Sequence, residues 1–339
     1  IKWDETKNDW VETNGSDPEW YNYGETESTR KWANAKTSDG SMWVWIPRYA
    51  YSITSGYQSS SAGNIEVEFM KGLTNETSTG RKSFNNASGQ GKWNIHPAFN
   101  YGQTVSGLWV AKFEASNSSG KIKVEPGVQS WRSITVNDIY TNCLNYNKTL
   151  NSHMMKNDEW GAVAYLSKSK YGKNAEVDIN SDSSYYTGGG SGNAYVTNVG
   201  QSTTGTVHGV YDMSGGAWEY VAAYVNNGNS NLTNYGSSLV NGDAKTKNVY
   251  SKGSSDSRDN NYSANSGKYG DAVYETSANG NSSSSSWYGD YSYFPSTSGP
   301  FFVRGGNCND GTGAGVFCFY NINGNSHSII SFRPVLVAL

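Results

Sequence analysis

Two rigid-looking borders near the end of the chain constrain its folding more than any other feature. Residues 302–306 form the first border, residues 331–336 form the second, and residues 307–330 lie between them. The enclosed segment contains no Lys, Glu, Gln, Met or Trp. These are the residue types that an AAC or AAT codon cannot reach when only its adenines change. We therefore expect a fixed frame around a segment with variable side chains, although loops also favour Asn, Gly and Ser for turn geometry alone.

The low charge of the chain argues against a nucleic-acid partner. Only 16% of the 339 residues are charged and the net charge is −3, whereas phosphate contacts need a basic surface. Aromatic residues make up 14%, which supplies apolar area for a core although only 35% of the residues are hydrophobic. Low charge with abundant Asn, Ser, Gly and Tyr is typical of extracellular β-rich proteins, so we expect an extracellular location.

The cysteines and the start of the chain say less about the compartment. Cys143, Cys308 and Cys318 are odd in number, so no complete disulfide framework exists. Whether Cys308 and Cys318 pair stays open. No apolar run approaches the roughly 20 residues that cross a bilayer, so we expect no direct membrane insertion. The chain begins at Ile1 and not at Met, from which we expect a truncated start and a missing targeting or anchoring segment.

The chain is long enough for one large domain or two ordinary ones, and we expect one. Residues 1–40 spread four Trp through polar sequence and are predicted to be an extended lead-in packed on the body. Residues 41–339 are predicted to form a single ligand-binding domain. Within it, residues 42–51 and 107–117 are predicted strands, and Pro47 marks the end of the first strand or a bulge.

Two helices are expected in the middle of the chain. Residues 133–144 repeat apolar side chains at three- and four-residue spacing, which gives one apolar face. Residues 156–166 carry acidic residues near their start, where negative charge suits the helix dipole. Residues 225–300 are expected to be a long ordered insert, because Tyr and Trp recur among its Ser, Asn and Gly. The order of elements indicates an α+β fold with an irregular β-rich core, two helices and long inserts.

Residues 209–220 read GVYDMSGGAWEY. They resemble the signature turn of the formylglycine-generating-enzyme (sulfatase-modifying-factor) branch of the C-type lectin fold. Further segments resemble this branch in the expected order. Residues 108–117 resemble its early strand, residues 128–131 with the helix that follows them and residues 155–160 resemble its two helices, and residues 304–306 and 331–336 resemble its closing strands. The resemblance spans roughly residues 40–339 and implies a C-type lectin fold of the formylglycine-generating-enzyme type.

The same branch contains the variable proteins of diversity-generating retroelements, in which the fold presents one randomised face to a ligand. Residues 314–317, 319, 323–324 and 331–333 resemble the fixed framework of such a variable region. The ligand contacts that the resemblance implies are each Asn or reachable from an Asn codon: Asn307, Cys308, Asp310, Gly313, Cys318, Tyr320, Ile322, Ser326, His327, Ser328 and Ile329. We expect Tyr320 and Ile322 to be the central anchors, with polar Asn and Ser around them.

The branch also contains enzymes, which leaves a formylglycine-generating oxidoreductase as an alternative. The oxygen-dependent enzymes place two cysteines close together after the Arg-Gly-Gly strand as a copper-binding pair. Here Cys308 follows Gly306 by two residues and Cys318 comes ten residues later, a spacing that does not match. Four scattered histidines show no metal-ligand spacing: His96, His153, His208 and His327. We therefore expect no enzyme activity, no metal and no other cofactor.

Several other conspicuous residues have structural interpretations. Residues 178–182 are acidic but lack the full ligand pattern of a calcium loop, which favours a solvated turn. We expect Trp218 to pack in the core and Glu219 to accept hydrogen bonds from main-chain amides. Arg304 and Arg333 are expected to brace the frame and not to bind an anion. The remaining tryptophans expected in the core are Trp43, Trp45 and Trp109.

These patterns favour a receptor-binding protein or adhesin whose partner is a variable protein or a cell-surface ligand. In the proteins that it resembles, such a face serves a phage tail, or a pilus or bacterial cell surface. We expect the missing N-terminal region to provide that anchoring, and residues 225–300 to support or rim the face. A structural surface protein with no selected ligand is the second alternative.

Overall fold

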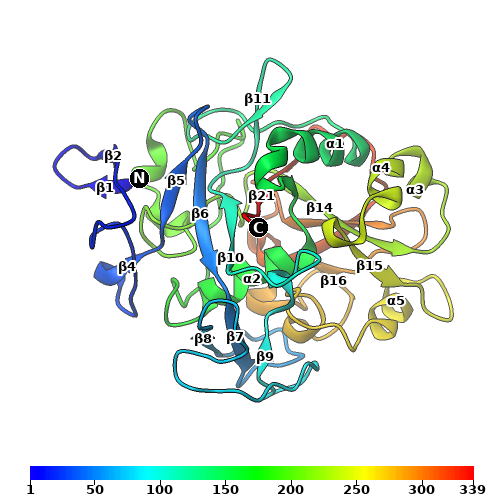
Figure 1. The fold of residues 1–339 in the computed structure, drawn as a ribbon. Helices are drawn as coiled ribbons and strands as arrows, with labels where there is room; N and C mark the ends of the chain where they lie inside the picture. Colours follow the sequence, from blue (N-terminus) through cyan, green and yellow to red (C-terminus); the bar gives the residue numbers. More distant parts are fainter.

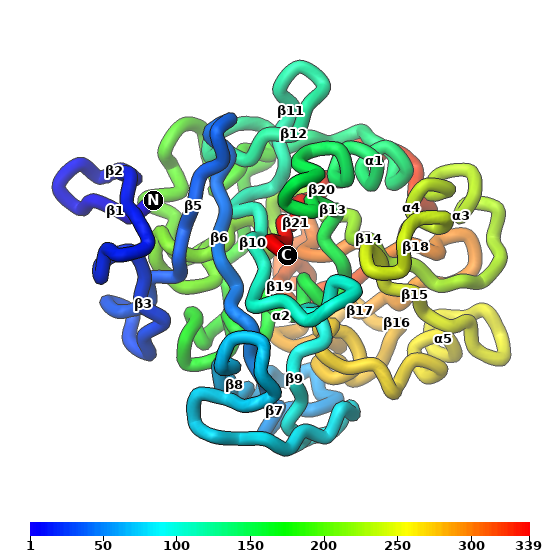
Figure 2. The backbone as a smooth tube through the Cα atoms, in the orientation of Figure 1, coloured from blue at the N-terminus to red at the C-terminus, as the bar shows by residue number.

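The computed structural model describes residues 1–339 as a strand-rich α/β protein with five α-helices and a curled, half-barrel sheet (Figure 1). This confirms the expected mixture of strands and helices. Figure 2 shows the N-terminal strands at one side of the molecule and the insert of residues 225–300 at the opposite side. The C-terminus lies between them, close to the middle of the view.

One sheet has five antiparallel strands in the order β13-β21-β10-β6-β5. These strands are β5 (Asn34–Lys36), β6 (Met42–Pro47), β10 (Gly107–Ala111), β13 (His153–Met154) and β21 (Pro334–Leu336). In this sheet Trp109 lies opposite Trp45. Strand β6 ends at Pro47 as expected, because proline has no main-chain N–H to continue a ladder.

The two predicted strands are each divided in the structure. The chain turns after β6 and continues as β7 (Tyr49–Ile53), which pairs with β8 (Ile65–Phe69) and β9 (Asn94–Ile95) in a separate three-stranded sheet. Similarly, β10 is followed by β11 (Ser116–Ser118), which forms a hairpin with β12 (Lys121–Lys123). Apolar composition identified these segments as strands but not the points at which they change sheet.

The second large sheet has seven strands and contains most of the two borders. Its strands are β14 (Trp218–Asn226), β15 (Asn248–Ser251), β16 (Asn281–Ser282), β17 (Ser292–Tyr293), β18 (Phe301–Gly305), β19 (Gly315–Ile322) and β20 (Ile330–Phe332). The order is β15-β14-β18-β19-β17-β16, and β20 pairs with β14. The enclosed segment therefore begins after β18, passes through β19 and ends at β20.

This sheet has buried side chains on both faces. Along β14, Val221 and Ala223 belong to one part of the core, which has 39 buried residues. Tyr220 and Ala222 belong to the other part, which has 29 buried residues. Successive side chains of a strand point to opposite faces, so the sheet separates the two parts of the core and both of its faces contribute to stability.

The two predicted helices are α1 (Val136–Tyr146) and α2 (Asn157–Lys168). The Thr135 side chain accepts a hydrogen bond from the main-chain N–H of Asp138 and so caps α1. Helix α2 is buried on nearly all sides. Three short helices in the insert bring the total to five: α3 (Asn231–Asn234), α4 (Ser237–Asn241) and α5 (Arg258–Ala264). None of the five is long and apolar enough to cross a membrane.

The N-terminal segment contributes small antiparallel pairs and aromatic contacts to the body. Its strands are β1 (Lys2–Asp4), β2 (Asp9–Val11), β3 (Asn22–Tyr23) and β4 (Arg30–Lys31). The Trp10 indole N–H donates to the Tyr195 hydroxyl over 3.1 Å, and the Trp32 indole N–H donates to the carbonyl oxygen of Tyr171 over 2.9 Å. Both indoles are buried, so this segment completes the core.

Candidate functional site

Strand β19 sorts the side chains of the enclosed segment onto two faces. Phe317 and Phe319 lie on one face, within the larger part of the core. Cys318, Tyr320 and Ile322 lie on the other face. Because side chains alternate along a strand, all three predicted contact residues of β19 share a face, and the predicted framework aromatics share the opposite face.

A cavity of about 400 Å³ opens over the second face of β19; we call it the β19 cavity. Six of its twelve lining residues are predicted contacts: Asn307, Asp310, Tyr320, Ile322, His327 and Ile329. The other six come from β14, β18, β20 and the insert: Trp218, Ser283, Tyr291, Tyr293, Val303 and Ile330. The central pair Tyr320 and Ile322 and the loop residue His327 are all partly exposed, so these predicted contacts are within reach of a ligand.

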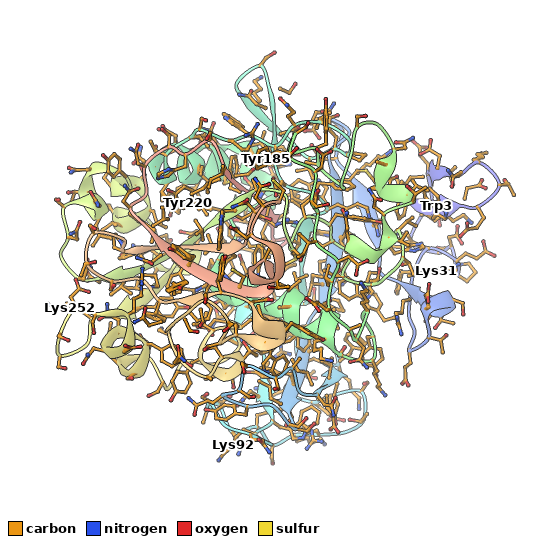
Figure 3. The ribbon with its side chains drawn as sticks, turned by 180° about the vertical axis from the view of Figure 1, so that it is seen from behind. Trp3, Lys31, Lys92, Tyr185, Tyr220 and Lys252 are labelled. Atoms are coloured by element: carbon orange, nitrogen blue, oxygen red, sulfur yellow. The ribbon has the colours of Figure 1, made fainter.

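Five predicted contacts do not line the β19 cavity. Ser326 and Ser328 are exposed on the loop beside it. Cys308 is only 8% exposed and lies against Tyr185, which Figure 3 labels in the view from behind. Gly313 is buried because the Tyr291 ring packs over it, within 2.3 Å of where a Cβ would stand.

Cys318 corrects the predicted contact set. Its side chain is fully buried, and burial raises the pKa of the thiol well above its usual value. It lies on the same face of β19 as Tyr320 but beneath the surface, so it is excluded as a ligand contact. Cys308 and Cys318 are both free thiols, which answers the open question of their pairing.

Four aromatic rings line the β19 cavity in mutual contact. The Tyr320 centroid is 5.5 Å from that of Trp218 and 4.8 Å from that of Tyr293. The Tyr291 ring stacks on Trp218 at 6.3 Å and is edge-on to Tyr320 at 6.3 Å. Such offset and edge-to-face pairs are favourable arrangements. Each ring therefore packs against the next, and the aromatic wall is preorganised for binding.

Asp310 is the only Asp, Glu, Lys or Arg that lines the β19 cavity. Its Oδ2 accepts hydrogen bonds from the main-chain N–H of Asn307 over 2.7 Å and from the Asn307 amide over 2.8 Å. Burial raises the pKa of Asp310, whereas the Asn307 donor and the Trp218 side chain lower it. The carboxylate is thus held in place at the cavity wall by its own turn.

The loop between β19 and β20 is held by hydrogen bonds from the body. The Tyr220 hydroxyl, labelled in Figure 3, donates to the carbonyl oxygen of Asn325 over 2.7 Å. The main-chain N–H groups of Ser133 and Val136 donate to the carbonyl oxygens of His327 and Gly324 over 2.9 and 3.1 Å. Because these bonds involve main-chain oxygens of the loop, its outward side chains can change while its path is kept.

Two buried arginines brace the strands beneath the β19 cavity. Arg304 donates to the carbonyl oxygens of Cys318, Asp271 and Ala272 over 2.8 to 3.0 Å. Arg333 donates to both carboxylate oxygens of Glu219 and to the carbonyl oxygens of Ala111 and Tyr211. Both are therefore framework residues, as predicted.

The role of Glu219 differs from the prediction. Its carboxylate pairs with Arg333 and not with main-chain amides. The two residues are separated by 114 positions in sequence. A buried carboxylate needs a partner, and the partner that it finds depends on the tertiary fold.

Two other cavities lie away from the enclosed segment. The largest, about 680 Å³, lies between the N-terminal segment and residues 205–208 and is lined mostly by polar residues. A third, of about 370 Å³, is lined by Trp45 and Trp109 together with aromatic residues of the N-terminal segment. Both tryptophans are partly exposed, so only Trp43 of the three predicted core tryptophans is fully in the core. The β19 cavity differs from both because it combines converging polar groups with aromatic walls, as ligand sites usually do.

Residues outside the enclosed segment complete the β19 cavity and were not predicted. Tyr291 and Tyr293 come from the insert, and Trp218, expected only in the core, also lines the wall. The insert was expected to rim this face, and its recurring tyrosines were the available signal. Strand β17 pairs in parallel with β19, and this pairing brings the two tyrosines to the β19 cavity.

No group of three or more His, Cys, Asp or Glu side chains is arranged to hold a metal ion. In the acidic segment 178–182, Asp178 forms an ion pair with Lys173 at 2.7 Å. Asp182 accepts a hydrogen bond from the main-chain N–H of Ser184 at 2.8 Å. These contacts are those of a turn at the surface. Comparison with known proteins gives no assignment: no family model matches the chain, and no curated protein is similar to it.

Proposed function

We propose that this chain is a ligand-binding protein whose recognition surface is the β19 cavity and the adjoining loop 323–329. We further propose that the fold is a C-type lectin fold of the formylglycine-generating-enzyme type, and that the surface is diversified by a retroelement. The protein acts outside the cell, as an adhesin of a pilus or bacterial surface or as a receptor-binding protein of a phage. Its partner is a protein or a cell-surface ligand.

One observation carries this proposal: codon-accessible side chains of the enclosed segment converge on one cavity over a braced frame. Tyr320, Ile322, His327 and Ile329 reach this cavity, while Phe317 and Phe319 of the same strand remain in the core. Substitutions at exposed positions cost little stability. The arrangement therefore permits many ligand-binding surfaces on one stable fold.

The oxidoreductase alternative receives less support from the two thiols. A nucleophilic or metal-binding cysteine acts as the thiolate and must be reachable by substrate. Burial raises the pKa of both Cys308 and Cys318. Cys318 has no exposed surface at all, so a peptide substrate cannot reach it without rearrangement of β19.

Sequencing the DNA beside the gene tests the proposal. We expect a reverse transcriptase gene and a near-copy of the 3′ end, with adenines at codons that differ from the gene at positions 320, 322, 326–329 and 310. A near-copy that differs instead at the codons for the core aromatics 317 and 319, or the lack of any near-copy in the complete genome, would rule out diversification.

A direct binding screen tests recognition separately. Variants randomised at positions 320, 322 and 327 should fold and should yield binders to more than one unrelated protein when they are displayed and selected. A matched library randomised at 317, 319 and 332, which are buried framework positions, should contain few folded members. Equal folding of the two libraries would contradict the proposed separation of frame and surface.

A further inference from the structure

The walls of the β19 cavity carry a chemical preference that goes beyond the shape of the site. Trp218, Tyr291, Tyr293 and Tyr320 supply aromatic rings, and Asp310 supplies a single negative charge. The Tyr291 ring packs over Gly313, and the main-chain N–H of Gly313 donates to the carbonyl oxygen of Asp310 over 3.1 Å. The carboxylate therefore lies close to the Tyr291 end of the aromatic wall.

The Asp310 carboxylate has capacity for one more donor. Its two oxygens offer about four acceptor positions. The Asn307 main-chain N–H and the Asn307 amide account for two, both on Oδ2, and the Trp218 side chain lies close to the carboxylate. Asp310 is only partly buried, so a donor that arrives through the cavity can reach it.

The remaining walls are aliphatic. Val303, Ile322, Ile329 and Ile330 line the cavity alongside the rings. An apolar wall beside an aromatic and acidic end matches a group with an aliphatic stem and a charged head, as in Lys and Arg side chains. A cation gains from the faces of Trp and Tyr within about 6 Å of the ring centroid.

The protein already contains such a contact beside this cavity. The Arg258 guanidinium lies 4.6 Å from the Tyr293 centroid and donates to Asn321 over 2.9 Å. This arginine belongs to α5 and is not a lining residue. An aromatic ring of the wall thus accepts a cation even where no carboxylate bonds to that cation.

We propose that the β19 cavity binds a basic side chain, lysine or arginine, presented by a protein ligand, with its charged head against Asp310 and the aromatic rings and its stem along the isoleucines. The inference rests on the proposed ligand-binding function and specifies the chemistry of the ligand. A volume of about 400 Å³ is within the range of sites that enclose a small ligand group.

Two small probes of nearly equal shape test this inference. Butylguanidinium carries the positive charge, and butylurea is its neutral counterpart. Binding is followed through the NMR signal of the Trp218 indole N–H, assigned with the variant Trp218→Phe. We expect the wild-type protein to bind butylguanidinium at least about tenfold more tightly than butylurea, which corresponds to about 1.4 kcal/mol, and the preference to shrink as salt is added.

Variants locate the source of the preference. Asp310→Asn should abolish most of the preference, whereas Asp182→Asn removes the same charge from a nearby surface turn outside the cavity and should leave it unchanged. Tyr320→Leu keeps apolar volume and should weaken butylguanidinium more than butylurea. This second variant decides the matter if Asp310→Asn does not fold. Methylguanidinium, which lacks the stem, should bind more weakly than butylguanidinium.

Three outcomes would overturn the inference: equal affinity of the wild type for the two butyl probes, binding of neither probe, or an Asp310→Asn variant that folds and keeps the full preference. None of them bears on the proposed diversification, because a cavity that prefers a neutral ligand is still a recognition surface. The neighbouring DNA and the display libraries report on the proposed function independently of these probes.

Discussion

The two faces of β19 belong to one strand but have different surroundings. Phe317 packs against Trp287, with ring centroids 5.0 Å apart, and Phe319 against Phe294 at 6.5 Å. On the opposite face, Tyr320 packs against the partly open aromatic wall of the β19 cavity and stays partly exposed. The difference shows that the strand alternation assigns a residue to a face, whereas the layers above that face decide whether it can change.

The buried face should be intolerant of truncation. Phe319→Ala should lower the free energy of unfolding by about 3–5 kcal/mol, because it removes a buried ring and leaves a cavity. Urea unfolding measures the change, with Tyr320→Ala as the control from the opposite face. A loss for Tyr320→Ala as large as that for Phe319→Ala would contradict the comparison.

The core behind the buried face should give a specific pH dependence. Glu275 accepts hydrogen bonds from the hydroxyls of Tyr51 and Tyr165 over 2.7 and 3.0 Å, and burial raises its pKa from 4.5 to about 7. The folded protein therefore holds this proton more strongly than the unfolded chain. Stability from this group is complete below about pH 4.5 and is lost as the pH rises toward 7.

The comparison with Glu275→Gln isolates this effect. Relative to that variant, the wild type should lose about 3 kcal/mol of unfolding free energy between pH 4.5 and 7. Burial also lowers the pKa of His96 to about 3, and this shift makes the protein more stable as the pH rises. Because His96 is present in both proteins, its contribution cancels in the difference between them. A difference that is constant with pH would show that Glu275 is not protonated in the fold.

Cys318 is the boundary case, because it shares a face with Tyr320 but is fully buried. Cys318→Ser should cost about 1–3 kcal/mol, since it buries a hydroxyl without a partner. Cys318→Ala is the control for the lost volume alone and should cost less. If thermal unfolding shows that Cys318→Ser does not change stability, position 318 tolerates substitution and belongs with the variable positions and not with the frame.

The smallest effect is expected at the rim of the β19 cavity. Ile329 is 39% exposed, so Ile329→Asn should change the free energy of unfolding by no more than about 0.5 kcal/mol. The same variant should change which ligands are selected in a display experiment. A destabilisation comparable to that of Cys318→Ser would show that the rim is part of the frame.

Local patterns were sufficient to predict part of this fold. The three- and four-residue spacing that predicted α1 is visible within a dozen residues, as is the apolar run that became β6 with its end at Pro47. The borders on either side of residues 307–330 are also local features. They predicted where the fixed strands would lie, although each border contains one arginine, Arg304 or Arg333, that the fold buries.

Features set by distant segments were not predictable from these patterns. Whether Trp45 and Trp109 are covered depends on where the N-terminal segment packs, and that segment lines their cleft without closing it. The partner of Glu219 lies 114 residues away. The convergence of Tyr291 with Tyr320 depends on a parallel pairing between β17 and β19. In each case the deciding contact joins residues that no local periodicity relates.

Three rings of the β19 cavity wall, Trp218, Tyr291 and Tyr293, belong to segments outside residues 307–330. Under the proposed diversification, every descendant of this gene would inherit them unchanged. Members of such a repertoire would then share a preference for groups that pack on aromatic rings. They would differ only in the half of the cavity lining that comes from residues 307–330. A new variant would then begin with weak, unspecific binding to the three constant rings, and its diversified residues would only have to add specificity.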